Sequence, residues 1–296
     1  MNMKKTILTL LAFMLVLPCF GETAKFYFDK ASRVRKDADK VKYYTLAIDK
    51  NKKFANAYLN RGAIHLKLEN YDKSIADLTR ATELNPSGEK AYYYRAIGYY
   101  RTESYDEAVS DLSKALNRKS DFMKAYYFRA RAFQQLKFFD DSLQDYSKAI
   151  SLEPKKAYLY HYRAITFAES EKYDNALSDF GKAIAFDPKN PVIRKNRGCL
   201  NLKLKNFKDA YSDLTKALKM DKNLSEAHIC IAGYWWMYKK SVSKAVDTLE
   251  IVFKSGFDDI EALYDVKREG FYFTTLVDTP QFKRLVEQYS KANGEK

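Results

Sequence analysis

The stretch AYYYRAIGYY, residues 91–100, places one charged side chain, Arg95, among tyrosines and small apolar residues. A second stretch, AYYFRARAFQ, residues 125–134, carries Arg129 at the same place. An unusual residue that recurs at a fixed interval in a similar setting indicates a repeated structural unit. We call the step from position 95 to position 129 the repeat interval. The same interval separates equivalent residues in other parts of the chain.

Five kinds of residue recur at the repeat interval over five consecutive units. The arginines are Arg61, Arg95, Arg129, Arg163 and Arg197, and the aspartates are Asp77, Asp111, Asp145, Asp179 and Asp213. Alanine recurs at positions 81, 115, 149, 183 and 217, and Tyr or Phe at 71, 105, 139, 173 and 207. Glycine or alanine directly follows each arginine. Columns in one register over five units indicate a repeat architecture.

The residue pattern of each unit predicts two helices joined by a tight turn. In the second unit the helices lie near residues 89–102 and 105–116, where apolar residues are spaced by three and four. Pro86, Pro154 and Pro188 lie in the loops that end the second helices. Small residues in fixed columns let two antiparallel helices approach closely. The sequence therefore predicts an all-α protein.

A helix–turn–helix unit of this length, with small residues at its eighth, twentieth and twenty-seventh positions, resembles the tetratricopeptide repeat. Here those positions hold Gly62, Ser74 and Ala81 in the first unit and equivalent small residues in the next four. The resemblance implies a right-handed superhelical α-solenoid with helical caps at both ends. It implies five repeats, at residues 55–88, 89–122, 123–156, 157–190 and 191–224.

The flanking segments are expected to extend the solenoid. Residues 22–54 match a degenerate repeat or N-terminal cap, because Ala47 precedes Ala81 by one repeat interval. Residues 225–256 match a degenerate sixth repeat if one residue is inserted. Residues 257–296 are expected to form C-terminal capping helices, the last beginning at Thr279 and Pro280.

The arginine and aspartate columns predict ion pairs within each unit, because the two positions lie on antiparallel neighbouring helices. The expected pairs are Arg61–Asp77, Arg95–Asp111, Arg129–Asp145, Arg163–Asp179 and Arg197–Asp213. A planar guanidinium can bind a carboxylate through two hydrogen bonds while its stem packs on apolar neighbours. The alternative, a row of arginines that grips an anionic ligand, would leave the aspartate column unexplained.

The resemblance also implies a concave groove lined by fixed positions of the first helices. On this chain those positions include Tyr93, Tyr100, Arg101, Tyr127, Arg131, Gln134, Gln135, His161 and Lys195. Aromatic residues and arginine often carry binding energy at interfaces. We expect Tyr93, Tyr127, Arg131 and His161 to be the main anchors, arranged as a stripe. The alternative is that these tyrosines only pack on neighbouring helices.

The N-terminal segment, residues 1–21, resembles a secretory signal peptide. Lys4 and Lys5 precede an uncharged apolar run, residues 6–17, which is followed by PCFG. Cleavage after Gly21 is expected. The alternatives are a lipid-anchored protein modified at Cys19, for which the preceding LVLP is a poor signal, and an uncleaved anchor.

The formal net charge is +14, and it is +12 for residues 22–296, because Lys4 and Lys5 are the charged residues before them. A basic surface attracts nucleic acid, anionic lipid or acidic proteins. Export argues against nucleic acid, and the alternative is an ordinary solvated surface. Beyond Cys19 there remain Cys199 and Cys230, which face one another on adjacent first helices if the resemblance holds. We expect them to be free, partly buried thiols; the alternative, in an oxidising compartment, is a disulfide.

No motif of the sequence indicates catalysis. Phosphate loops, nucleophile elbows and paired-histidine metal motifs are absent from it. No metal or cofactor is expected. The sequence thus predicts an exported, periplasmic or envelope protein of bacterial type, a non-catalytic scaffold for a protein or peptide partner, with an acidic partner favoured. The alternative is a structural or self-associating envelope protein, held by lipid at Cys19 or by basic contacts to anionic lipid.

Overall fold

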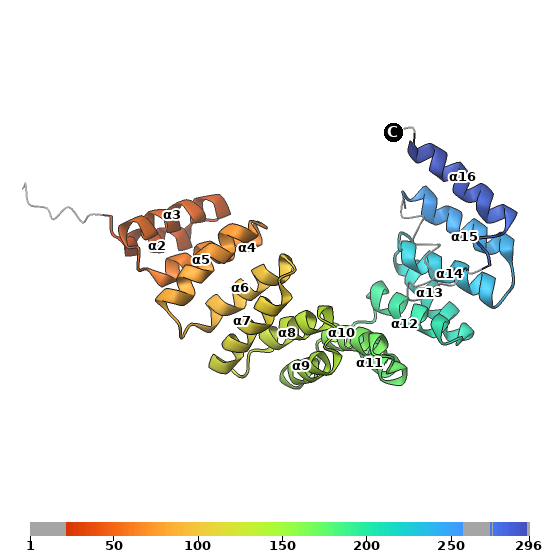
Figure 1. Ribbon diagram of the computed structural model, residues 1–296, viewed down its shortest axis with the longest axis horizontal. Helices are drawn as coiled ribbons and strands as arrows, with labels where there is room; N and C mark the ends of the chain where they lie inside the picture. The colour runs from red at the N-terminus through yellow and green to blue at the C-terminus, as the bar shows by residue number, and fades with distance from the viewer. Residues whose placement is uncertain (1–21, 257–272, 274, 295–296) are drawn as a thin grey trace, which may run out of the picture. The chain divides into compact units, whose positions relative to one another are not determined.

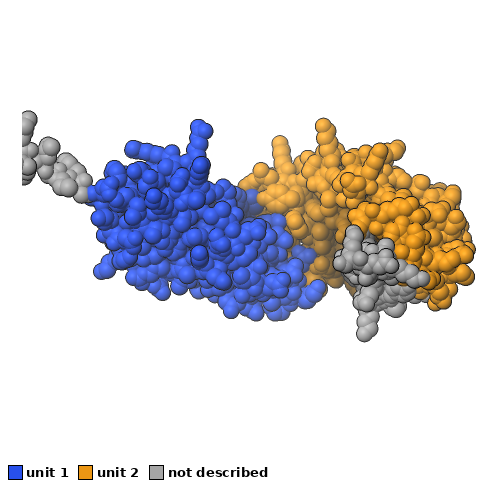
Figure 2. Space-filling view, turned by 90° about the horizontal axis from the view of Figure 1, so that it is seen from above, with its two compact units in different colours: residues 1–138 blue, residues 139–296 orange. Residues whose placement is uncertain are grey.

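The computed structural model describes residues 22–256, 273 and 275–294. Over these residues it contains fifteen α-helices and no strand. The chain forms two compact units, residues 1–138 and residues 139–296 (Figure 2). The proposed signal segment, residues 1–21, and residues 257–272 lie outside the described part. Within the described part, no helix combines the length and the apolar character needed to cross a membrane.

Unit 1 is a succession of helices in which each packs against the next (Figure 1). Its helices are α2 (Ala24–Arg33), α3 (Asp37–Lys50), α4 (Ala55–Lys67), α5 (Tyr71–Leu84), α6 (Glu89–Arg101), α7 (Tyr105–Arg118) and α8 (Met123–Gln135). The first helices of successive pairs also touch, α4 with α6 and α6 with α8. This is the packing of an α-solenoid, in which each repeat contacts its neighbours.

Unit 2 is built in the same way. Its helices are α9 (Phe139–Leu152), α10 (Ala157–Glu169), α11 (Tyr173–Phe186), α12 (Pro191–Lys203), α13 (Phe207–Met220), α14 (Ser225–Met237), α15 (Val242–Lys254) and α16 (Pro280–Gly294). The helix α16 packs on α15, where the rings of Phe253 and Tyr289 stack with centroids 5.4 Å apart. Thr279 precedes α16, and its Oγ1 accepts a hydrogen bond from the Phe282 backbone amide.

The helix starts follow the repeat interval of the sequence. First helices begin at Ala55, Glu89, Met123, Ala157, Pro191 and Ser225, each one repeat interval after the one before. In the first five pairs the second helix follows at a constant step, as from position 55 to position 71. The step from α14 to α15, from position 225 to position 242, is longer by one. The extra residue lies in the loop between α14 and α15, where an insertion was expected.

The turn between the two helices of a pair uses a left-handed residue that is not glycine. Glu69, Glu103, Lys137, Glu171 and Lys205 have φ values of 60° to 64°, and they too are separated by the repeat interval. This conformation is costly for a residue with a side chain. Packing of the two helices must compensate for the cost in every repeat.

The small-residue column allows the helices to meet. A Cβ atom added at Gly62 would lie 2.8 Å from Leu78 Cγ, and one added at Gly198 would lie 2.8 Å from Leu214 Cγ. The alanines that occupy the same column in other repeats, such as Ala96 and Ala164, are fully buried. A larger side chain at this position would separate the pair.

Four of the five expected ion pairs lie wholly inside unit 1 or wholly inside unit 2, and each is bidentate. Arg61 donates to Asp77 at 2.7 and 2.7 Å, Arg95 to Asp111 at 2.6 and 2.9 Å, Arg163 to Asp179 at 2.6 and 3.0 Å, and Arg197 to Asp213 at 2.6 and 2.9 Å. All four aspartates are buried. Hydrogen bonding to Asp77 and Asp213 raises the pKa values of Arg61 and Arg197. Arg129 lies in unit 1 and Asp145 lies in unit 2, so their pairing stays a prediction.

The third nitrogen of the guanidinium reaches the preceding repeat. Nη1 donates to a hydroxyl earlier in the chain, on the second helix of the repeat before. The hydroxyls belong to Thr45, Thr79, Ser113 and Ser147, at 2.9, 3.1, 2.9 and 2.9 Å. The arginine therefore joins three helices: its own, the second helix of its repeat and the second helix of the preceding repeat.

One repeat has no hydroxyl at this position. Gly181 stands where the others have Thr or Ser, and a Cβ atom added there would meet only Arg197 Nη1, at 3.9 Å. Arg197 thus lacks the hydroxyl that its counterparts bind, in a space large enough for one.

This gap gives a stability prediction. Gly181→Ala should stabilise the chain by about 1 kcal/mol through helix propensity. Gly181→Ser should add a hydrogen bond to Arg197. The test compares Gly181→Ser with Gly181→Ala, once with Arg197 present and once in an Arg197→Leu background. The serine variant should exceed the alanine variant in free energy of unfolding by about 1 kcal/mol more when Arg197 is present. Denaturant melts of the four variants measure this difference. An equal serine-over-alanine difference in both backgrounds would show that no such bond forms.

Candidate partner-binding surface

An aromatic and basic cluster lies on the first helices α6 and α8 of unit 1. The Arg131 guanidinium carbon lies 4.9 Å from the ring centroid of Tyr100 and 5.7 Å from that of Tyr127. Arg131 also donates a long hydrogen bond of 3.5 Å to the Tyr127 hydroxyl. All three side chains are half-buried. The structure therefore brings together three of the predicted groove residues.

Two exposed residues extend this cluster. Arg101 ends α6 and Gln135 ends α8, and both are exposed. Each follows the cluster on its own helix, so the ends of α6 and α8 offer a cation and an amide to solvent. We call Tyr100, Arg101, Tyr127, Arg131 and Gln135 the unit 1 cluster.

Two predicted groove residues are placed in the interior instead. Tyr93 is 7% exposed, and its ring lies 4.7 Å from that of Phe122 and 6.0 Å from that of Phe128. Gln134 is 8% exposed. The expectation that Tyr93 is an open anchor is wrong, because α8 and the loop before it cover its ring. The packing alternative holds for this tyrosine.

A small pocket lies near the beginnings of α4 and α6. Its volume is about 240 Å³. It is lined by Ala55, Asn56, Leu59, Ala81, Asn85, Gly88, Glu89, Lys90 and Ala91. Asn56 and Leu59 occupy groove positions of the first repeat, so this pocket belongs to the same face of the first helices.

In unit 2, His161 is already engaged. Its Nε2 atom shares a hydrogen bond of 2.7 Å with the Asn196 amide, and its ring lies 5.9 Å from that of Phe180. Burial and the nearby Lys195 charge lower the pKa of His161 to about 4. His161 is therefore neutral near pH 7 and adds no positive charge to this face.

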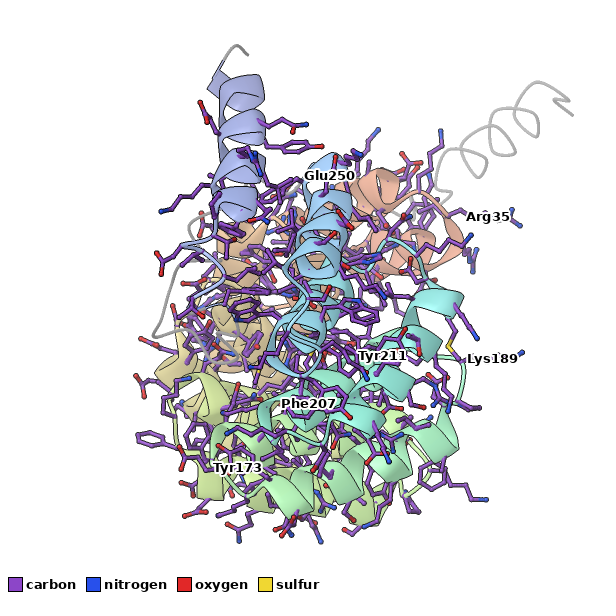
Figure 3. All side chains as sticks on the ribbon, turned by 90° about the vertical axis from the view of Figure 1, so that its right-hand side faces the viewer. Arg35, Tyr173, Lys189, Phe207, Tyr211 and Glu250 are labelled. Atoms are coloured by element: carbon purple, nitrogen blue, oxygen red, sulfur yellow. A yellow bond between two sulfur atoms is a disulfide. The ribbon has the colours of Figure 1, made fainter. Side chains whose placement is uncertain are left out.

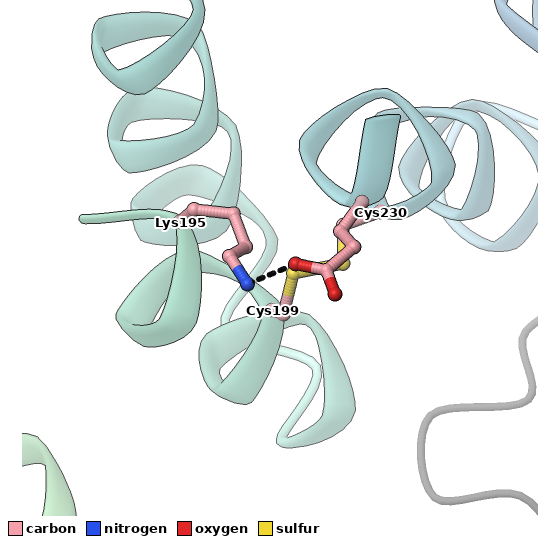
Figure 4. Close-up of a disulfide and its surroundings, with 4 residues drawn as sticks. Lys195, Cys199 and Cys230 are labelled. Carbon is pink, nitrogen blue, oxygen red and sulfur yellow. Dashed lines mark hydrogen bonds and ion pairs between the residues drawn. A yellow bond between two sulfur atoms is a disulfide. The ribbon is translucent and has the colours of Figure 1, made fainter. Parts of the chain in front are cut away.

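Lys195 is also held by a partner in unit 2. It forms an ion pair with Glu226 on α14, and its side chain is 12% exposed. The pair spans the two neighbouring first helices α12 and α14, as Figure 4 shows. The predicted cations of this face are therefore neutral or neutralised inside unit 2.

Beside this ion pair, Cys199 and Cys230 form a disulfide (Figure 4). Their Cα atoms are 5.7 Å apart, a separation that a disulfide spans without moving the backbone. The expectation of two free thiols is wrong. Adjacent first helices approach closely enough at these groove positions for the sulfur atoms to bond. The disulfide fixes α12 to α14 and covers part of the face.

Sequence reasoning missed two single partners and one repeated column of partners. Asn196 and Glu226 occupy no repeated column, so no pattern could reveal them. The hydroxyl column of Thr45, Thr79, Ser113 and Ser147 was visible, because its members are separated by the repeat interval. As for metals, the described residues contain no group of three His, Cys, Asp or Glu side chains placed to hold an ion.

The paired helices, their constant interval and their packing define an all-α solenoid. Models of the tetratricopeptide repeat match residues 55–87 and residues 127–191. The chain is a tetratricopeptide repeat protein. The handedness of its superhelix stays a prediction.

Several solved structures are similar in fold. A tetratricopeptide repeat protein from Parabacteroides merdae ATCC 43184 matches with a TM-score of 0.66 and 15% identity, covering 91% of this chain and all of that one. YrrB, described as a TPR protein with an unusual peptide-binding site, matches with a TM-score of 0.54 and 24% identity over 62% of this chain and 95% of its own. MamA matches with a TM-score of 0.54 and 20% identity over 57% and 94%. A comparison with curated proteins found no match.

Proposed function

We propose that this protein is a non-catalytic scaffold that binds a protein or peptide at the unit 1 cluster. The observation that carries the proposal is the placement of Arg131 over the rings of Tyr100 and Tyr127. Aromatic and arginine side chains supply most of the energy at many interfaces. Tyrosine also offers a large contact area at low entropic cost.

The charge of unit 1 favours an acidic partner. Residues 22–138 contain 24 Lys and Arg and 15 Asp and Glu, a net charge of +9, whereas residues 139–296 have 26 and 23, a net charge of +3. Complementary charge accelerates association and makes it sensitive to salt. An acidic peptide would therefore meet the unit 1 cluster under a favourable potential.

The fold supports a binding role without defining the partner. YrrB, a protein of similar fold, is described as having a peptide-binding site. The small pocket between Asn56, Leu59 and Glu89 would admit one side chain of an extended peptide. A peptide that enters this pocket and follows the first helices would reach the unit 1 cluster within the same unit.

We further propose that the protein is exported to a bacterial envelope, where such a scaffold would serve in assembly. The disulfide between Cys199 and Cys230 supports this, because structural disulfides persist in oxidising compartments. The signal-like segment of residues 1–21 is the second support.

Export makes a specific prediction for protein recovered from its host. Mass spectrometry should find an N-terminus at Glu22, and iodoacetamide should label Cys199 and Cys230 only after reduction. Detection of a lipid on Cys19 would instead support the alternative, a lipid-anchored protein. Labelling of both thiols before reduction, together with an intact residue 1, would contradict export.

The binding proposal predicts a loss of affinity in the variant Tyr127→Ala/Arg131→Ala. Peptides selected from a random library on the full chain supply the ligand, and fluorescence polarisation supplies Kd. The double variant should weaken binding by on the order of tenfold or more, because it removes the arginine and one of its two rings. Circular dichroism should show an unchanged fold, since both side chains lie outside the core.

The matched control is Arg80→Ala/Arg118→Ala, which removes two exposed charges from the second helices α5 and α7. It should bind the selected peptides nearly as well as the natural chain. If the control loses binding and the Tyr127 and Arg131 variant keeps it, the second-helix surface is the binding face and the proposal is wrong.

A further inference from the structure

Half of the net positive charge lies in the first helix pair. Residues 24–53 contain ten Lys and Arg and four Asp, a net charge of +6, while residues 22–296 together have +12. This segment forms α2, α3 and the loops that follow each of them. We call α2, α3 and these loops the N-terminal hairpin.

Three of these charges stand together at the tip of the hairpin. Arg33 ends α2, and Arg35 and Lys36 form the loop before α3. All three are exposed, and among the described residues none of them forms an ion pair. Figure 3 shows Arg35 at the outer margin of the ribbon. By contrast, Lys25 is paired with Asp29 and Lys52 with Asp49.

Aromatic side chains lie beside another cation of the hairpin, Lys30. Phe26 is 46% exposed. Lys30 Nζ lies 5.7 Å from the Phe26 ring centroid and 4.8 Å from that of Tyr43. Phe26, Lys30 and Arg33 are spaced by four and three residues, so they follow one face of α2.

The rest of α2 shows that this face points outward. Tyr27 and Ala31 are buried against α3, in a cluster with Tyr44, Ala47 and Ile48. The hairpin is the first helix pair that the structure describes, and no other described pair covers the Phe26 face. The hairpin therefore presents an exposed ring on α2 and three unpaired cations at its tip.

We propose that the N-terminal hairpin docks on an anionic lipid surface. Basic residues next to such a surface each add favourable energy, and an exposed aromatic ring adds apolar contact at the headgroup level. Exposed cations on long, flexible side chains suit a laterally fluid surface better than one fixed peptide. The contact lies apart from the unit 1 cluster and goes beyond the proposed binding of a protein.

In the uncleaved alternative, in which residues 1–21 stay attached, the sequence adds a second argument for this occupant. The apolar run of residues 6–17 ends seven residues before α2 begins. A short chain of this length keeps the hairpin within about 25 Å of wherever that run is held. The affinity of the hairpin itself does not require the run to remain attached.

The test compares full-length chains on two kinds of vesicle. The charge variant is Arg33→Gln/Arg35→Gln/Lys36→Gln. The matched control, Lys216→Gln/Lys219→Gln/Lys222→Gln, removes the same charge from exposed positions of unit 2. Vesicles contain phosphatidylcholine alone or with about 30% phosphatidylglycerol, and sedimentation gives the partition coefficient. All the compared chains share residues 1–21, so a difference between variants comes from the substituted positions.

We expect phosphatidylglycerol to raise partitioning of the natural chain and of the control strongly. The hairpin variant should lose on the order of tenfold or more of this gain, because three cations leave the contact. Phe26→Ser should lower partitioning onto both vesicles while it leaves the dependence on salt unchanged. Circular dichroism melts confirm that each variant is folded.

Three results would overturn the proposal. The hairpin variant could retain the full phosphatidylglycerol gain, or the control could lose as much of it as the hairpin variant. Alternatively, the hairpin variant could lose affinity for soluble polyglutamate while it binds anionic vesicles like the natural chain. That last result would assign the hairpin to an acidic protein partner.

Discussion

In four of the five repeats, a guanidinium donates a hydrogen bond to a hydroxyl of the preceding repeat. Two nitrogens of Arg95 bind both oxygens of the buried Asp111, and the third binds the hydroxyl of Thr79 in the preceding repeat. The rings of Tyr92 and Tyr99 flank the same cation. These bonds and the carboxylate of Asp111 offset the cost of taking the Arg95 charge out of water between the helices. The same arrangement joins the two helices of a repeat to each other and to the second helix of the preceding repeat.

The same interaction decides where a partner can bind. Four of the repeated arginines are paired with aspartates, and in unit 2 Lys195 is paired with Glu226 while His161 is neutral. Arg131 lies outside the arginine column, over the rings of Tyr100 and Tyr127. The cations of the N-terminal hairpin also lie outside the column. Both proposed binding surfaces therefore lie where the chain departs from its own repeat.

Features set by the repeat could be predicted from the sequence, whereas features set by single contacts could not. The helix starts, the closing helix at Pro280 and the bidentate pairs follow from columns of residues that each repeat must supply. The burial of Tyr93 depends on how α8 approaches α6, and the disulfide depends on the spacing of α12 and α14. A distance between neighbouring repeats is not encoded at any one position. The sequence therefore predicted which types of residue form the candidate site, but only partly which of them are exposed.

The central claim is that the repeated arginine stabilises the solenoid through its aspartate, and a double-mutant cycle on Arg95 and Asp111 tests it most directly. Asp111→Leu alone should cost roughly 3–5 kcal/mol in free energy of unfolding, because it leaves Arg95 partly buried without its carboxylate. Adding Arg95→Leu should recover part of that loss, with a coupling energy of more than about 0.5 kcal/mol in urea melts. Strictly additive costs for the two substitutions would contradict the account.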